Sequence, residues 1–235
     1  MKRRREAEVV ASEIRSAIEQ LSQMEVHRRT ASGTSGSAGG VDGDQLTATA
    51  QVPIKPFLSL CNLLIQVLDK IGPTMAVLRL DIHQNIQRLE KFHDSDPSTY
   101  WDVVEILKKE VGEGKAKVGP TCCKAFVWLT RSLDFTVALL ELIVKDSGRP
   151  MQQAVEESYN KTLKPWHGWI SSAAYKVALK LVPDIQTFTC VLKASDQDSD
   201  MLKEEMQKMI SLLIPVIHQN QDIMRTYGLD KWKGT

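Results

Sequence analysis

Residues 126–144 read FVWLTRSLDFTVALLELIV, and they are the most informative part of the chain about its fold class. Projected on a helix that turns about 100° per residue, the apolar side chains fall on two nearly opposite faces. One face carries Phe126, Leu129, Leu133, Val137, Leu140 and Val144, and the other carries Trp128, Phe135, Leu139 and Leu142. Because a helix that is apolar on two sides is buried on two sides, this stretch predicts stacked helical layers.

The sequence on either side of this stretch has the same helical periodicity. Further helices are predicted at about 57–71, 74–93, 150–163, 169–181 and 200–226. Ser98 is the expected N-cap of one more helix, which carries Trp101 and Leu107. The alternation of apolar and polar residues that is typical of strands is not seen. The predicted fold class is all-α.

The chain before this region divides into two segments. Residues 1–27 predict a helix, because their apolar residues recur at spacings of three and four, and we expect it to be loosely attached to the rest. Residues 28–51 are rich in Ser, Gly and Thr without periodicity, which is typical of a flexible linker or loop. A single helical domain is expected to span residues 52–235.

The composition excludes several classes of protein. Of the 235 residues, 43% are apolar, and 30 Lys and Arg balance 29 Asp and Glu to a net charge of +1. A chain of this kind has enough apolar residues for a core and lacks the basic surplus of a duplex-binding protein, so we expect no nucleic-acid partner. No apolar stretch reaches the roughly 20 residues that cross a bilayer, and the opening MKRRREAEVV lacks the apolar core of a secretory signal. We expect a soluble, cytosolic protein.

The motifs of common enzymes are missing from the sequence. It contains no GxSxG elbow, P-loop, HExxH pair or glycine-rich dinucleotide fingerprint. Its five histidines and four cysteines show no spacing typical of metal ligands. We therefore expect no enzyme activity, no metal and no cofactor, although an enzyme that uses Asp81 and His167 as acid and base stays an alternative.

One predicted helix carries a row of three polar residues beside its apolar face. With Asp81 at zero on the helical wheel, Asn85 falls near 40° and Arg88 near −20°. The simplest interpretation is an ion pair at a solvated helix edge, which contributes little to stability. The functional interpretation is a set of an acceptor, an amide and a donor, which suits a polyhydroxylated head group or an amide.

Two aromatic residues outside this helix are further candidates. Trp128 lies on the second apolar face of its helix, where it is either a core residue or a flat platform for a sugar. His167 lies between Trp166 and Trp169 at a predicted break between helices, beside Pro165. A histidine there is either structural or part of a site or of a membrane-facing edge.

Three motifs taken together resemble the glycolipid transfer protein family. They are DIHQNIQR at 81–88, VWLTRSLDF at 127–135 and YNKTLKPWHGW at 159–169, and their order and separation are similar to the family's. The resemblance spans residues 52–235 and leaves out the Ser- and Gly-rich segment. Segments such as KPFLSLC at 55–61 resemble plant members.

The resemblance implies a two-layer, all-helical sandwich that encloses an apolar pocket for the chains of one lipid. It further implies that Asp81 and Asn85 hydrogen-bond sugar hydroxyls, that Arg88 contacts the sugar or nearby oxygens, and that Trp128 stacks under the first sugar. His167 would bind the carbonyl of the ceramide amide and Asp81 its N–H. Trp169, with Trp166 nearby, would contact the membrane.

Trp128 also bears on the choice of lipid. The family's branch that carries ceramide-1-phosphate is similar but has a basic residue where this chain has Trp128. A phosphate requires several cationic donors, whereas an indole offers a stacking face, so a neutral glycosphingolipid is favoured. Arg131 lies one helical turn away and keeps the phosphate as an alternative.

The function implied by the resemblance is ATP-independent transfer of glycosphingolipids, of the glucosyl- or galactosylceramide type, between membranes. The carrier would be a monomer that meets the membrane surface only transiently. Two alternatives use the same pocket: transfer of ceramide-1-phosphate, or a glycolipid sensor or adaptor.

Overall fold

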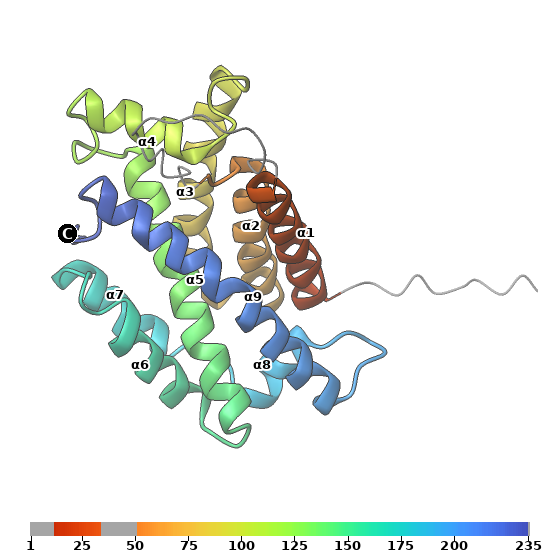
Figure 1. The fold of residues 1–235 in the computed structure, drawn as a ribbon. Helices are drawn as coiled ribbons and strands as arrows, with labels where there is room; N and C mark the ends of the chain where they lie inside the picture. The colour runs from red at the N-terminus through yellow and green to blue at the C-terminus, as the bar shows by residue number, and fades with distance from the viewer. Residues whose placement is uncertain (1–11, 34–50, 235) are drawn as a thin grey trace, which may run out of the picture.

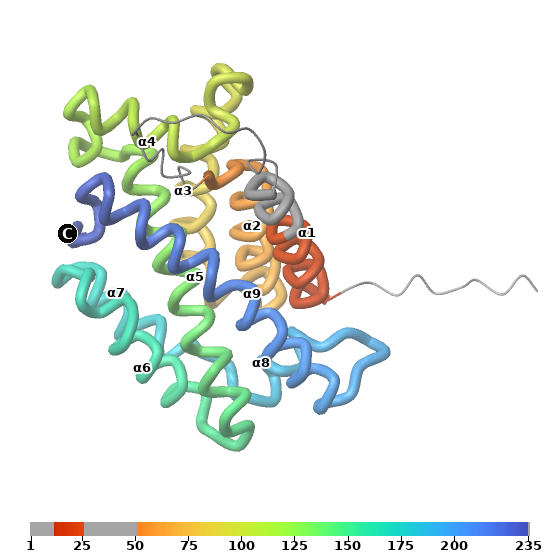
Figure 2. Tube along the Cα trace, in the orientation of Figure 1, coloured from red at the N-terminus to blue at the C-terminus, as the bar shows by residue number. Residues whose placement is uncertain are grey.

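The computed structural model of the protein describes residues 12–33 and 51–234 (Figures 1 and 2). These residues form nine α-helices and one short 3-10 helix, and no β-strand occurs among them. The elements are α1 Glu13–Gly33, α2 Ile54–Ile71, η1 Pro73–Met75, α3 Ala76–Ser95, α4 Val103–Gly112, α5 Cys122–Lys145, α6 Met151–Thr162, α7 Trp169–Leu179, α8 Ile185–Leu192 and α9 Ser199–Thr226. The predicted all-α fold class is confirmed.

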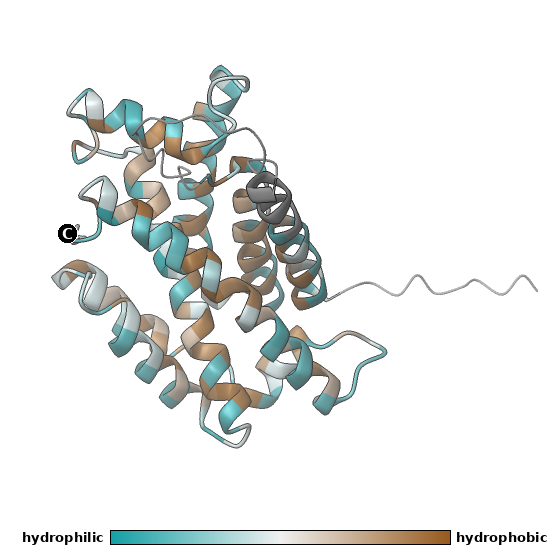
Figure 3. Cartoon of the chain, in the orientation of Figure 1, coloured by the Kyte–Doolittle hydropathy of each residue, from teal (hydrophilic) through white to brown (hydrophobic). Residues whose placement is uncertain are grey.

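The helices stack in two layers, with α5 at the centre (Figure 1). Helices α3, α4, α6 and α9 all pack against α5. Further contacts join α3 to α2, α2 to α1, and α1 to α9. In Figure 3 apolar residues run along α2, α5 and α9, and the loops at the edge of the molecule are mostly hydrophilic.

Neighbouring helices cover both apolar faces of α5, one of them more completely than the other. Phe126, Leu129 and Leu133 are fully buried on one face, and Leu139 is buried on the other. Trp128, Phe135 and Leu142, also on the second face, are only half-buried. The second face is therefore covered less completely than the first, and part of the Trp128 indole stays accessible.

The first turn of α5 is fixed by two side chains. The hydroxyl of Thr121 accepts a hydrogen bond from the backbone N–H of Lys124 at 3.1 Å. The carboxylate of Glu110, on α4, accepts from the N–H groups of Cys122 and Cys123 at 2.9 and 2.7 Å. These bonds satisfy backbone donors that have no partner inside the helix, so they set where α5 begins and how it meets α4.

The N-terminal helix α1 packs firmly on the domain. Ile14, Ala17 and Leu21 are buried where α1 lies against α2 and α9. The helix also runs to Gly33, six residues beyond the predicted end at residue 27. The segment from 34 to 50, which contains most of the predicted linker, lies outside the described residues.

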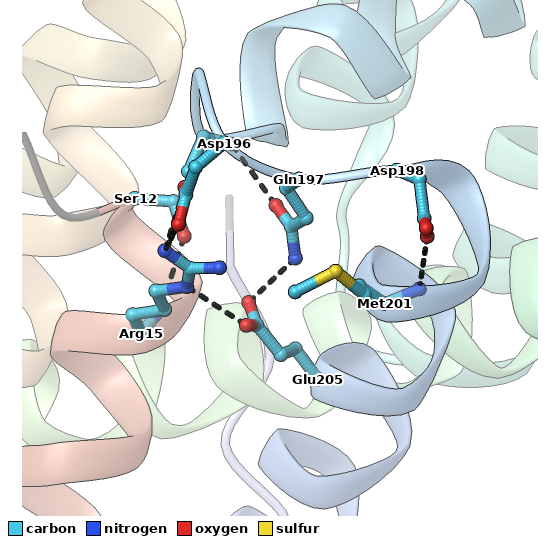
Figure 4. A network of polar contacts seen from close by, with 8 residues as sticks. Ser12, Arg15, Asp196, Gln197, Asp198, Met201 and Glu205 are labelled. Carbon is cyan, nitrogen blue, oxygen red and sulfur yellow. Dashed lines mark hydrogen bonds and ion pairs between the residues drawn. The ribbon is translucent and has the colours of Figure 1, made fainter. Parts of the chain in front are cut away.

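A polar network ties α1 to the start of α9 (Figure 4). Nε of Arg15 donates to Glu205 at 2.8 Å, and Nη1 donates to Asp196 at 2.9 Å. The amide of Gln197 donates to the second oxygen of Glu205 at 2.7 Å. The structure thus differs from the expected loose attachment, because apolar burial and this network both join α1 to the domain.

Two details of the helix predictions are wrong. Ser98 does not cap α4: the helix begins at Val103, and Asp102 is its N-cap. One carboxylate oxygen of Asp102 accepts from the N–H groups of both Val104 and Val52, at 3.0 and 2.9 Å, and this second bond comes from a distant segment that local sequence does not show. Helix α8 is also absent from the predictions.

The chain from 12 to 33 and from 51 to 234 contains no helix long and apolar enough to cross a bilayer.

Candidate functional site

The polar row on α3 forms a connected chain of hydrogen bonds. The side-chain amide of Asn85 donates to the backbone carbonyl of Asp81 at 2.9 Å. Nη1 of Arg88 donates to the side-chain oxygen of Asn85, also at 2.9 Å. Asn85 is only 6% exposed, so these two bonds fix the orientation of its amide. The side chain of Asp81 takes no part in these two bonds, so its carboxylate is left to meet a ligand.

The carboxyl group of Asp81 has a raised pKa. The residue lies at the surface, yet the surrounding protein removes enough water to raise the pKa of its carboxyl group above the usual value. The charge of Arg88 acts in the opposite direction and limits this increase. A partly desolvated carboxylate beside one guanidinium is a strong acceptor for hydroxyl or amide N–H groups.

The second part of the site forms where Trp128 meets His167. Their ring centroids lie 5.3 Å apart with an interplanar angle of 47°. Trp128 comes from the second turn of α5, and His167 from the turn between α6 and α7. The α6–α7 turn holds its shape because the N–H groups of Trp166 and His167 both donate to the carbonyl of Leu163.

Tyr159 holds the imidazole of His167 in place. The Tyr159 hydroxyl lies 3.2 Å from Nδ1 of His167, and the two rings are 5.4 Å apart. On its other side Tyr159 stacks on Tyr175 of α7, with centroids 3.4 Å apart and planes 5° from parallel. Burial lowers the pKa of His167, and the nearby charge of Arg131 lowers it further. The imidazole is therefore neutral near pH 7.

Arg131 is buried, and its guanidinium is engaged by the segment that follows α9. It is 4% exposed, and its guanidinium donates to the backbone carbonyls of Trp232 and Asp230 at 2.8 and 3.0 Å. Its Cζ lies 4.2 Å from the ring centroid of Trp166 and 5.1 Å from that of Trp128. Burial lowers its pKa to about 10, so it remains charged at neutral pH.

The two tryptophans predicted to contact the membrane have different surroundings. Trp169 is 80% exposed at the start of α7, next to the exposed Ile170. Trp166 is half-buried and packs against Arg131. Only Trp169 has the exposure that a membrane-contacting side chain needs.

The two parts of the site lie on helices that pack together. α3 contacts α5, and the thiol of Cys122, at the start of α5, donates to the carbonyl of Arg88 at 3.6 Å. The structure thus brings Asn85 and Arg88 into direct contact, and separately Trp128 and His167. The α3–α5 packing joins these two pairs, without a direct hydrogen bond between them.

Two hollows in the described chain lie away from these residues. One, of about 150 Å³, lies between α5 and α6, beside Glu141 and Lys161. The other, of about 420 Å³, is formed by α4 and the segment that follows it, beside Lys109 and Glu113. Both are lined partly by charged side chains, so neither is the apolar chain pocket, which stays a prediction.

Comparison with known proteins identifies the family. The sequence model of the family described as "Glycolipid transfer protein (GLTP)" matches residues 52–194. This chain belongs to the glycolipid transfer protein family. It is 51% identical over 222 residues to "Glycolipid transfer protein 3" of Arabidopsis thaliana, covering 94% of this chain and 92% of that protein. It is 48% identical to "Glycolipid transfer protein 2" of the same plant, with the same coverage. The predicted plant-type membership is confirmed.

Solved structures agree on the glycolipid transfer protein fold. The structure described in "How FAPP2 Selects Simple Glycosphingolipids Using the GLTP-fold" has a TM-score of 0.71 and 25% identity, covering 81% of this chain and 93% of that one. A variant of Arabidopsis ACD11 (accelerated-cell-death 11) complexed with ceramide-1-phosphate has a TM-score of 0.76 and 16% identity, covering 95% and 100%. The latter likeness concerns the fold and carries no information about the lipid of this chain.

Sequence reasoning missed two features of this glycolipid transfer protein site. Tyr159 stands in the third motif, but its role beside His167 needs the fold of the α6–α7 turn. The segment that follows α9 lies against Trp128 and Trp166, and no local pattern indicates this. Only Arg131 indicated such a contact in the sequence, because a buried guanidinium needs hydrogen-bond acceptors, and these can come from a distant segment.

Proposed function

We propose that the protein transfers a neutral glycosphingolipid, of the glucosyl- or galactosylceramide type, between membranes without ATP. The observation that carries this proposal is the combination of the Asp81–Asn85–Arg88 row with the Trp128–His167 pair on packed helices. The family is one of lipid transfer proteins, which makes an enzyme the weaker alternative.

Each site residue has a role that its surroundings support. Asp81 and Asn85 hydrogen-bond sugar hydroxyls, and Arg88 orients Asn85 and contacts the sugar. Trp128 offers the accessible part of its ring to the first sugar. His167, held beside the Tyr159 hydroxyl, binds the ceramide carbonyl through a ring N–H, while Asp81 accepts from the amide N–H.

The contacts that Arg131 makes inside the protein disfavour a phosphate head group. Its guanidinium donates to two backbone carbonyls and lies against the ring of Trp166. Arg88 is the cation of the polar row, and its Nη1 already donates to Asn85. A phosphate needs several free cationic donors, so this surrounding fits a sugar better than ceramide-1-phosphate.

Exposed apolar side chains on two helices are available to contact the chains of the lipid. Helix α7 has no buried residue, and its Val177 is exposed. At the start of α3, Val77, Leu78 and Leu80 are exposed as well. We propose that the lipid chains enter beside α7, which packs chiefly on α6 and can shift relative to the rest.

The energetics of such a carrier require no nucleotide. Each CH₂ group that leaves water for an apolar pocket gains about 0.8 kcal/mol, so a ceramide hardly ever leaves a bilayer unaided. A carrier that solvates the chains about as well as the membrane does lets the lipid move down its gradient. Trp169 can enter the membrane interface without a spanning helix, so we propose a cytosolic monomer that docks transiently.

The test is transfer of fluorescent glucosylceramide between phosphatidylcholine vesicles by the whole chain. Trp128→Ala should lower the transfer rate at least about ten-fold, because we expect the loss of the stacking face to cost roughly 1–3 kcal/mol, as for a base stacked on an aromatic side chain. The matched control is Trp101→Ala, which removes an exposed tryptophan from the α3–α4 connection. Equal transfer by both variants, with the fold intact, would show that the site assignment is wrong.

The sensor alternative has a different signature. Tight binding of glucosylceramide with negligible transfer between vesicles, in the unaltered protein, would favour a sensor or adaptor over a carrier. Recovery of chemically altered lipid after many transfer cycles would favour an enzyme that uses Asp81 and His167.

A further inference from the structure

The segment that follows α9 folds back onto the aromatic part of the site. The N–H of Gly234 donates to the backbone carbonyl of Trp166 at 2.7 Å. A Cβ atom on Gly234 would lie 2.9 Å from Cζ2 of Trp128, closer than Cβ atoms approach other atoms. The backbone at Gly234 is therefore in direct contact with the six-membered ring of Trp128, and a glycine is what permits this approach.

Arg131 holds this segment in place through two hydrogen bonds. Nη1 donates to the carbonyl of Trp232 and Nη2 to that of Asp230, so one planar group bridges two carbonyls of the same short segment. Hydrogen bonds from a charged, buried donor are stronger than those between neutral groups. A lysine at this position would carry the same charge but lacks the planar fork that reaches both oxygens.

The same guanidinium also contacts the two indoles of the site. It lies against the rings of Trp166 and Trp128, at 4.2 and 5.1 Å from their centroids, which is within the range of cation–π attraction. On the outer side, Nζ of Lys124 lies 5.2 Å from the ring centroid of Trp232. Arg131 thus links the segment, the platform Trp128 and the α6–α7 turn in one cluster.

We propose that Arg131 is a positioning residue that holds Asp230–Gly234 as a wall of the head-group site, and that this wall limits the head group to one sugar. This inference rests on the proposed function. A sugar that stacks on Trp128 has this segment at its edge. A second sugar attached to the first has to displace the segment, which is held by three hydrogen bonds. The wall therefore discriminates by head-group size, not by charge.

The experiment compares two lipids that differ by one sugar. Glucosylceramide and lactosylceramide with the same labelled acyl chain are transferred separately between phosphatidylcholine vesicles by the unaltered chain, Arg131→Lys, Arg131→Met and a chain that ends at Leu229. The unaltered chain should prefer glucosylceramide. In Arg131→Met and in the shortened chain the ratio of the lactosylceramide to the glucosylceramide rate should rise roughly ten-fold, and in Arg131→Lys by less.

The shortened chain keeps the test valid if Arg131→Met does not fold. It retains Leu229, which is fully buried, and it leaves Arg131 in place. A second readout needs no lipid: the indole N–H resonance of Trp128 should shift when residues 230–235 are removed. Loss of general stability would slow both lipids alike, so the ratio separates a positioning role from a structural one.

The outcomes are distinct. If the unaltered chain moves glucosylceramide and the ratio of the lactosylceramide to the glucosylceramide rate is the same in all variants, the inference about Asp230–Gly234 is wrong while the proposed function stands. If both rates fall in proportion in Arg131→Met and in the shortened chain, Arg131 is only structural and the inference is overturned. If the unaltered chain moves neither lipid, the proposed function is itself wrong and the inference falls with it.

Discussion

The Tyr159 hydroxyl lies 3.2 Å from Nδ1 of His167, at the centre of the aromatic part of the site. The same hydroxyl lies 3.4 Å from Oγ of Ser172, and the Tyr159 ring stacks on Tyr175 of α7. The histidine that we propose for the ceramide carbonyl is thus oriented by a residue of α6 that also contacts α7. Tyr159 therefore connects the histidine that we propose for the amide to helix α7.

Tyr159→Phe should slow transfer while the fold is kept. The variant retains the ring stacking but removes a hydrogen bond worth about 1 kcal/mol, so the rate of glucosylceramide transfer should fall roughly five-fold. The melting temperature should change little, because the ring remains buried. A transfer rate equal to that of the unaltered chain would show that Tyr159 does not orient His167.

Asp81→Asn should separate function from stability. Desolvation raises the pKa of Asp81 in the folded state above its unfolded value of about 3.9. The protonated carboxyl group therefore stabilises the fold below the unfolded pKa, and this stabilisation is lost as the pH rises through the folded-state pKa. At neutral pH the neutral amide should leave the free energy of unfolding unchanged or higher, while transfer falls.

The matched control for this variant is Asp94→Asn. It makes the same chemical change at an exposed position on α3, away from the polar row. Urea unfolding and vesicle transfer, measured on both variants, give the comparison. A large loss of stability in Asp81→Asn, or equal transfer in the two variants, would contradict the assigned role.

His167 should make stability decrease as the pH falls below its unfolded pKa of about 6.5. Burial and Arg131 lower the pKa of His167 in the folded state, so the unfolded chain binds more protons in this range. The stabilising contribution is present above about pH 6.5 and is lost as the pH falls through the folded-state pKa. Unfolding free energies between about pH 7.5 and about pH 5.5 should show a smaller slope in His167→Gln than in the unaltered chain. Identical slopes would exclude His167 as the titrating group.

Leu21→Ala tests whether α1 belongs to the folded domain. Leu21 is 2% exposed and packs in the core that α1 shares with its neighbours. Its truncation should lower the free energy of unfolding by about 2–5 kcal/mol, in one cooperative transition. Glu19→Ala, at an exposed position on the same helix, should change it little. If Leu21→Ala has no effect, α1 is attached as loosely as its sequence suggests.

The sequence predicted those parts of the fold that depend on local periodicity. The two apolar faces of α5 determine its central position. The wheel of α3 places Asp81, Asn85 and Arg88 in one row, along which Asn85 donates to the Asp81 backbone and Arg88 donates to Asn85. The motifs also led to the family. These predictions succeed because a helix fixes the relative positions of residues three and four apart.

Contacts between distant segments could not be predicted in this way. Arg131 lies next to Trp128 on the wheel and looks available to a phosphate, yet its acceptors are Trp232 and Asp230, about a hundred residues further along the chain. The firm packing of α1 likewise depends on Asp196 and Glu205, which local pattern does not connect to Arg15. Both cases concern a charged side chain whose partners are set by tertiary packing.

A paired transfer assay distinguishes a neutral glycosphingolipid from ceramide-1-phosphate as the lipid that the protein carries. Glucosylceramide and ceramide-1-phosphate with the same labelled acyl chain are placed in phosphatidylcholine donor vesicles, and the unaltered protein moves each to acceptor vesicles. We predict that glucosylceramide moves at least about ten-fold faster, a difference of about 1.4 kcal/mol. Equal rates, or faster movement of ceramide-1-phosphate, would show that the proposed preference for a neutral glycosphingolipid is wrong.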